Sequence, residues 1–280
     1  MPLANGDRVR IARRDARLIA FAALVAGGPA CAQDRDVEEI INSGAAGATL
    51  QLSTGIDFSS GRYGEADRTE ILVVPASIRV RAAEWLSLGA SLALIRIDGP
   101  GVVLGPDNQP LPGFPVARQV RSGLGDLGAS ATVSVPTGSG SPWLIDLTGR
   151  VKLPTANKRR GLTTGKTDFS IGADVSYAVG NWAPFVDFGM RFAGDPAGIA
   201  LRDSPSVSLG AAGVVGKGAV IFSYDWQRAF SPLAKDSHSL FGAYSHRAAR
   251  HLDLTGYASI GLSDGAAAAE GGLLLTFKLD

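Results

Sequence analysis

Hydrophobic and polar residues alternate with a period of two along most of the chain. In the segment 50–58, for example, Leu50, Leu52 and Ile56 occupy alternate positions, and polar residues or glycine fill most of the positions between them. This period is typical of β-strands, because successive side chains of a strand point to opposite faces of the sheet. Twelve such segments can be recognised, of which 240–247 is the weakest. They begin near residues 50, 78, 86, 127, 143, 169, 186, 207, 220, 240, 252 and 273.

These segments predict an all-β fold, namely a transmembrane antiparallel β-barrel of about 12 strands. An even number of strands of about ten residues suits this architecture, since a tilted strand crosses a bilayer in roughly 9–11 residues. Closure of the sheet satisfies the backbone polar groups without leaving an edge. After residue 33, no stretch approaches the ~20 apolar residues that a transmembrane helix requires.

The connections between the segments alternate between short and long. The connections 83–84 and 216–218 are short, whereas 59–68, 98–122 and 154–166 are long. In outer-membrane barrels short turns face the periplasm and long loops face the outside. The longest connection, Asp98 to Ser122, contains five prolines and several apolar residues. We expect it either to fold into the mouth as a gate or to cover the outer rim.

Three of the four tryptophans lie at the short turns. These are Trp85, Trp143 and Trp182, whereas Trp226 lies near the opposite end of its segment. Aromatic side chains favour the two interfaces of a membrane. The positions therefore predict an aromatic girdle at the periplasmic rim.

The first 32 residues have the features of a cleaved signal peptide. A region with five arginines is followed by the apolar run Leu18–Ala26, and Ala30-Cys31-Ala32 fits a cleavage site. Lipidation of Cys31 and twin-arginine export through Arg13-Arg14 are the rival interpretations, and we prefer cleavage and ordinary export.

The chain then divides into three regions. These are a signal peptide, 1–32, a periplasmic N-terminal segment, 33–47, and the outer-membrane β-barrel, 48–280. Within the second region, Asp34 to Asn42 can form a short helix that either plugs the barrel or remains a loose tail.

Composition supports a β-rich chain and excludes several classes of site. Glycine accounts for 36 of 280 residues, about 13% against a usual ~7%, which disfavours helices and suits a crowded barrel interior. The net charge of +1 provides no field for nucleic acid. One cysteine and three histidines cannot form an internal disulfide or a usual His/Cys zinc cage. We therefore expect no cofactor, no metal and no nucleic-acid partner.

Three short motifs lie close together in the middle of the chain. They are Ser122–Leu127 (SGLGDL), Val151–Thr155 (VKLPT) and Thr164–Asp168 (TGKTD). They resemble the SGLGD, KLPTG and TG..D pattern of the outer-membrane barrel family named after the meta-pathway of phenol degradation. The resemblance implies an outer-membrane channel or transporter for passive uptake of a small, hydrophobic or aromatic solute. Ala156 and Asp280 depart from the pattern, which often has a glycine and a terminal aromatic residue there.

Charges of both signs lie on the polar faces of the segments. Inside a membrane such charges must face water or one another, so they are candidates for lining the lumen. The constriction candidates are Arg79, Arg81, Asp126, Asp146, Arg150, Lys152, Asp168, Asp187 and Arg191, and the same set continues with Asp174, Asp225, Asp253 and Lys278. Two interpretations stay open: a constriction that selects solutes by charge and size, and a salt-bridged network that closes the lumen of a structural or surface-interaction barrel.

A lipid hydrolase of the outer membrane is the third interpretation. His238-Ser239 and Ser245-His246 supply a base and a nucleophile, and His251 follows. Adjacent residues of a strand point to opposite faces, so neither pair can form a nucleophile–base contact. We therefore expect no enzymatic activity. The expected partners are outer-membrane lipid and lipopolysaccharide, the barrel-assembly machinery and a small-molecule solute.

Overall fold

The computed structural model describes residues 50–100, 103–107, 109–111, 118–196 and 200–279. These residues form thirteen strands and one short 3₁₀ helix, η1 (Lys158–Arg160). The strands are β1 (Leu50–Gly61), β2 (Thr69–Ala83), β3 (Leu86–Gly99), β4 (Gln119–Leu124), β5 (Leu127–Val135), β6 (Trp143–Leu153), β7 (Asp168–Tyr177), β8 (Trp182–Phe192), β9 (Ser204–Val215), β10 (Gly218–Gln227), β11 (Ser237–Ala249), β12 (Leu252–Gly261) and β13 (Ala269–Leu279).

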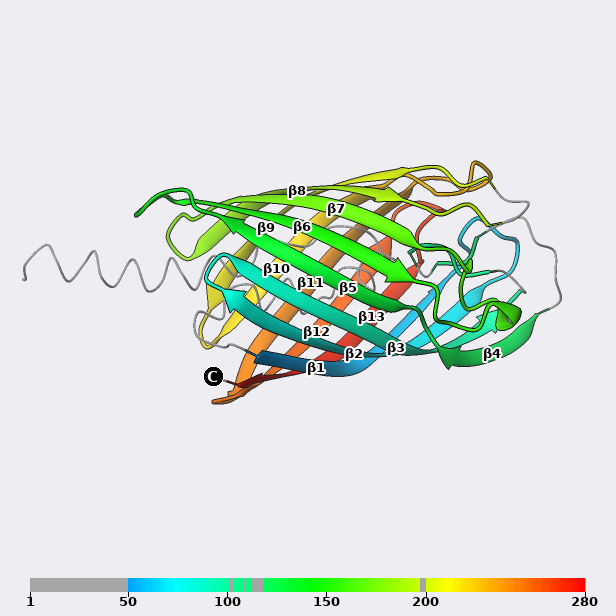
Figure 1. Cartoon of the computed structure of the whole chain (residues 1–280), viewed down its shortest axis with the longest axis horizontal. Helices are drawn as coiled ribbons and strands as arrows, with labels where there is room; N and C mark the ends of the chain where they lie inside the picture. Colours follow the sequence, from blue (N-terminus) through cyan, green and yellow to red (C-terminus); the bar gives the residue numbers. More distant parts are fainter. Residues whose placement is uncertain (1–49, 101–102, 108, 112–117, 197–199, 280) are drawn as a thin grey trace, which may run out of the picture.

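The strands close into one antiparallel barrel, which Figure 1 shows from the side. Strands that are neighbours in the sequence pair with each other, except β4 and β5, which both pair with β3, and β1 closes the sheet by pairing with both β2 and β13. Leu50 lies opposite Leu279 on one side and opposite Val80 on the other. The prediction of a twelve-stranded barrel is confirmed, with one strand in addition.

The additional strand is β4, which begins in the predicted connection 98–122 and ends just beyond it. The first half of β3 pairs with β5 and its second half pairs with β4. The chain therefore breaks at Gly125-Asp126 and continues along the same neighbour. The Gly125 amide donates to the Ala93 carbonyl at 2.8 Å in the break. A Cβ at Gly125 would come within 2.8 Å of Ile95 Cδ1, so a residue without a side chain fits there.

The two faces of the wall differ in polarity as the alternation predicts. In β1, Leu52, Ile56 and Phe58 are exposed on the outside, whereas Gln51 and Asp57 are buried on the inside. This arrangement is the reverse of a water-soluble domain, since exposed large apolar residues surround the whole barrel. An apolar outer band with a polar interior is what a bilayer requires.

The two ends of the barrel carry different connections. At the short-turn end the strands are joined by 84–85, 136–142, 178–181, 216–217 and 250–251. At the long-loop end they are joined by 62–68, 100–118, 154–167, 193–203, 228–236 and 262–268. In Figure 1 the short-turn end, which includes the end of β13, is on the left. The predicted alternation of connection lengths is therefore present.

Aromatic residues gather outside the wall at the short-turn end. Trp85, Trp143 and Trp182 are each between 42% and 52% exposed. Trp143 contacts Tyr177 edge to face, with ring centroids 4.9 Å apart. This is the arrangement that the predicted girdle requires.

Two predicted features lie outside the described residues, namely the signal peptide and the short helix at 34–42. Among the residues that the structure does describe, no helix is long and apolar enough to cross a membrane.

Candidate lumen site

The charged side chains of β6, β7 and β8 form two rows on the inner wall. In the first row, Arg150 lies opposite Ser170, which lies opposite Arg191. The same row continues from Arg150 in the other direction through Ser130 and Gly89 to Arg79. The sequence-predicted candidates Arg79, Arg150 and Arg191 therefore share one line of cross-strand neighbours.

The second row is acidic. Asp146 lies opposite Asp174, and Asp174 lies opposite Asp187. Beyond Ser208 the row reaches Asp225 on β10. Asp174, Asp187 and Asp225 are all at most 3% exposed. The acidic row therefore crosses five neighbouring strands, β6 to β10, and Ser208 stands in it on β9.

Small side chains separate the two rows. Thr148, Gly172 and Gly189 are cross-strand neighbours and stand between the arginines and the acids. A cavity opens over these residues and is lined also by Arg150 and Arg191. The glycines leave this space because a larger side chain would point into it.

A second cavity continues along β3, β5, β6 and β7. It shares Arg150, Ser170 and Arg191 with the first cavity. The two arginines therefore stand where the two cavities adjoin. Arg191 also lies 5.6 Å from the centre of the Phe230 ring, in the connection between β10 and β11.

The three sequence motifs meet in one buried ionic cluster near the long-loop end. The Lys152 ammonium lies 2.8 Å from Asp168 Oδ2 and 3.6 Å from Asp126 Oδ2. All three side chains are at least nine-tenths buried. Charges buried in this way are stable only when they are paired and hydrogen-bonded.

Hydrogen bonds link this ionic cluster to the loops. Asp126 accepts from the Ala156 amide at 2.9 Å and from the Thr163 hydroxyl at 2.6 Å. Asp168 accepts from the Gly194 amide at 2.9 Å, and Lys152 donates to the Gly105 carbonyl at 3.4 Å. The cluster therefore holds three different loops against the barrel.

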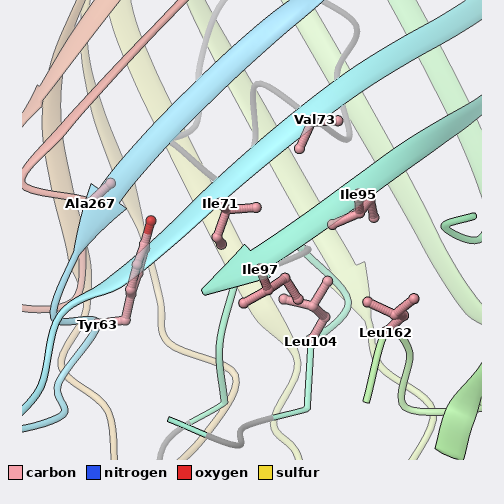
Figure 2. Close-up of a cluster of buried hydrophobic side chains, with 8 residues drawn as sticks. All are labelled: Tyr63, Ile71, Val73, Ile95, Ile97, Leu104, Leu162 and Ala267. Atoms are coloured by element: carbon pink, nitrogen blue, oxygen red, sulfur yellow. The ribbon is translucent and has the colours of Figure 1, made fainter. Parts of the chain in front are cut away.

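The inner wall becomes apolar at the long-loop end, which Figure 2 shows in close-up. Ile71 and Val73 on β2 and Ile95 and Ile97 on β3 point inward and are at most 3% exposed. Loop residues cover them. The mouth cluster, as we call it, consists of Tyr63, Ile71, Val73, Ile95, Ile97, Leu104, Leu162 and Ala267.

Tyr63 enters the mouth cluster with an unusual backbone conformation. Its φ is +51°, the only positive value of a non-glycine residue in the described chain. Its hydroxyl donates to Ser59 Oγ at 3.2 Å, and burial raises the pKa of Tyr63 above its ordinary value near 10. Backbone strain of this kind persists only where surrounding contacts hold it.

Other predicted candidates lie elsewhere on the inner wall. Asp253 and Lys278 pair near the short-turn end, where Arg247 Nε also approaches Asp253 at 3.6 Å. Arg81 lies opposite Ser87, in the row between the arginines and the acids. These residues do not join the cluster around Lys152.

Three inward-facing charged residues were missing from the candidate set. Asp57 accepts from the Tyr257 hydroxyl at 2.6 Å, and Glu270 lies diagonally across from it on β13. Arg121 on β4 donates to the Arg160 carbonyl at 3.3 Å. The alternation in β1 already placed Asp57 on the polar face, whereas Arg121 and Glu270 lie in predicted connections.

The histidines do not meet the serines beside them. Ser239 and Ser245 are buried on the inside. His238 is bonded to the exposed Tyr224 hydroxyl at 2.6 Å, and His246 stacks on the exposed Tyr244. Within the described part of the chain, no group of three or more His, Cys, Asp or Glu side chains is placed to hold a metal ion.

The closed barrel, with its apolar exterior and charged interior, defines the class of outer-membrane β-barrels. No protein-family model and no curated protein matches the chain. Among solved structures, the KdgM porin is similar with a TM-score of 0.51 at 6% identity, covering 82% of this chain and 99% of that one. The NanC porin has a TM-score of 0.49 at 6% identity, covering 82% and 100%. The transport unit of the autotransporter AIDA-I from Escherichia coli has a TM-score of 0.49 at 9% identity, covering 90% and 96%. At these identities the likeness to the KdgM porin shows the fold alone.

Proposed function

We propose that the protein is an outer-membrane channel for the passive passage of a small solute. The observation that carries the proposal is the pair of cavities on the inner wall, which meet between Arg150 and Arg191. A lumen with fixed charges and small residues selects solutes by charge and size. The porin fold of the KdgM structure supports this class of function.

The orientation and the export route that we propose are those of outer-membrane β-barrels. The long-loop end faces the outside and the short-turn end faces the periplasm, as in outer-membrane barrels. The segment 1–32 serves as the signal peptide, and the barrel-assembly machinery inserts the rest. Lipid and lipopolysaccharide surround the exposed apolar wall.

For the solute we propose a small compound with a hydrophobic or aromatic part. The mouth cluster supports this assignment, because it places apolar side chains on the inner wall at the long-loop end. The resemblance of the motifs to the meta-pathway family points to the same class of compound. The arginine and acid rows below the mouth would accept the polar part of such a solute.

A structural barrel with a closed lumen is the second candidate. The burial of the mouth cluster and of the Lys152 cluster favours it, because both fill the space near the long-loop end. Swelling of liposomes that contain the refolded protein separates the two functions. The channel predicts swelling in solutions of small sugars, and the structural barrel predicts none.

Ion selectivity provides the matching test of the site. Arg150→Gln with Arg191→Gln removes positive charge where the cavities meet, so the reversal potential of a salt gradient should shift toward cation selectivity. Arg250→Gln, in an exposed turn at the short-turn end, is the control and should leave the reversal potential unchanged. An equal effect of both changes would contradict the assignment of the constriction.

A further inference from the structure

One arginine projects from the outer, apolar face of the barrel. Arg96 on β3 is exposed, and its neighbours on that face, Leu94, Val120 and Leu124, are each more than half exposed. Among the residues that the structure describes, Arg96 has no hydrogen-bond or ion-pair partner. A lone guanidinium on a lipid-facing wall is costly unless it reaches the headgroup layer or an anion.

The height of Arg96 along the wall places it at that layer. It lies eleven residues after Trp85, which precedes β3 and belongs to the aromatic girdle at the short-turn end. A strand that rises about 3.3 Å per residue and tilts by about 40° climbs roughly 28 Å over this distance. The apolar band of such barrels is about 25 Å tall. Arg96 therefore stands just past the apolar band, on the side of the long loops.

Basic residues of η1 are attached to β4, the strand that pairs with this part of β3. Ser122 on β4 lies directly opposite Arg96, and the Arg160 guanidinium donates to the Ser122 carbonyl at 2.8 Å. Arg160 belongs to η1, whose three residues are all basic and exposed. Arg159 in this helix has no side-chain partner within the described residues.

The acidic residues of this region lie farther along the wall. Asp98 is two residues beyond Arg96 and is paired with Arg118, whose Nε lies 2.8 Å from Asp98 Oδ1. Glu70 lies opposite Asp98 and at the same distance beyond the membrane band. The patch of Arg96, Arg159 and Arg160 therefore keeps an excess of positive charge next to exposed leucines.

We propose that this patch binds a phosphate of lipid A in lipopolysaccharide. Guanidinium groups bind phosphate with two parallel hydrogen bonds, and the exposed Leu94 and Leu124 offer a surface for the acyl chains below it. Lipid A presents both parts in the leaflet that the long-loop end faces. The inference uses the orientation of the barrel but does not depend on whether the lumen conducts.

Native mass spectrometry of the refolded protein in detergent tests this site with diphosphoryl lipid A as the probe. Arg96→Gln should weaken lipid A binding about 5-fold, and Arg96→Gln with Arg159→Gln should weaken it about 25-fold, since each surface arginine near an anionic lipid headgroup contributes about 1 kcal/mol. Arg96→Lys keeps the charge but not the two parallel hydrogen bonds, so its affinity should lie between those of the wild type and Arg96→Gln. Channel conductance should be the same in all these variants, because Arg96 and Arg159 lie outside the lumen.

Control variants and control lipids distinguish specific binding of lipid A from a general effect of charge. Arg250→Gln removes an exposed arginine at the opposite end and should leave lipid A binding unchanged. Lipid A without phosphate and phosphatidylglycerol should each bind the wild type more weakly than diphosphoryl lipid A. Heat-dependent migration on gels confirms that each variant is folded. Unchanged binding by the folded double variant, an equal loss in Arg250→Gln, or equal binding of phosphatidylglycerol would overturn the proposal.

Discussion

The mouth of the barrel and its middle are filled in opposite ways. At the mouth, Ile71 and Ile97 point inward and loop residues such as Leu104 pack against them. In the middle, Gly172 and Gly189 point inward and leave a cavity between charged rows. The difference shows that closure near the loops depends on burial of apolar surface, whereas the width of the middle depends on the absence of side chains.

The largest effect on stability is expected from removal of the buried Lys152 charge, which holds the loops near the mouth. Lys152→Met leaves the carboxylates of Asp126 and Asp168 buried without their cation. Loss of one partner of a buried pair costs about 3–5 kcal/mol, so the free energy of unfolding in urea should fall by that amount. Lys235→Met breaks the fully exposed pair with Asp264 and should change stability little. Equal losses in the two variants would show that the ionic cluster does not hold the loops.

A charge in the mouth cluster should open it. Leu104 is fully buried, so Leu104→Asp places a carboxylate among apolar side chains unless the loop moves outward. We expect a stability loss of roughly 2–4 kcal/mol and a larger single-channel conductance in planar bilayers. Leu233→Asp changes a loop leucine that is 73% exposed and serves as the control. A conductance that rises in Leu233→Asp but not in Leu104→Asp would show that the mouth cluster does not close the path.

A large side chain in the middle should narrow the path without unfolding the wall. Gly172→Phe fills part of the cavity beside Arg150 and Arg191, and we expect the conductance to fall about two-fold. Gly149→Phe places the same side chain on the outer face of β6, where open space surrounds the glycine. It should leave conductance unchanged. Equal conductance in the two variants would contradict the path through this cavity.

The smallest effect is expected from the titration of Tyr63. Because burial raises its pKa, the folded chain keeps the phenol proton above pH 10, where the unfolded chain loses it. Stability from this residue is therefore complete below pH 10 and declines as the pH rises further. Urea unfolding between pH 9 and about 11 should show this decline in the wild type and a weaker one in Tyr63→Phe. An identical decline in both chains would assign it to other groups.

The alternation in the sequence was sufficient to predict the barrel but not the apolar packing at its mouth. In β1 one face meets lipid and the other meets the lumen, so Leu52 and Gln51 differ in polarity. In the run Ile71-Leu72-Val73-Val74 both faces are apolar, because one faces outward and the other meets the mouth cluster. The alternation disappears there, and the predicted strand started only at residue 78.

The candidate site, too, could be predicted from the sequence only in part. Asp126, Lys152 and Asp168 belong to the three motifs and the structure brings them together, whereas Arg150, which we expected beside them, is not part of their ion pairs. Arg121 was missed because β4 is short and follows a proline-rich stretch, and its pairing with β3 depends on the break at Gly125. Register across strands, which places Asp146, Asp174 and Asp187 in one row, is set by the closed sheet and is not visible in any single segment.

Single-channel recording in planar bilayers tests the central claim most directly. The account predicts discrete conductance steps for the wild type, larger steps for Leu104→Asp and smaller steps for Gly172→Phe. A folded protein that inserts into the bilayer and shows no steps in any of the three forms would contradict a path through the barrel and establish the closed, structural alternative.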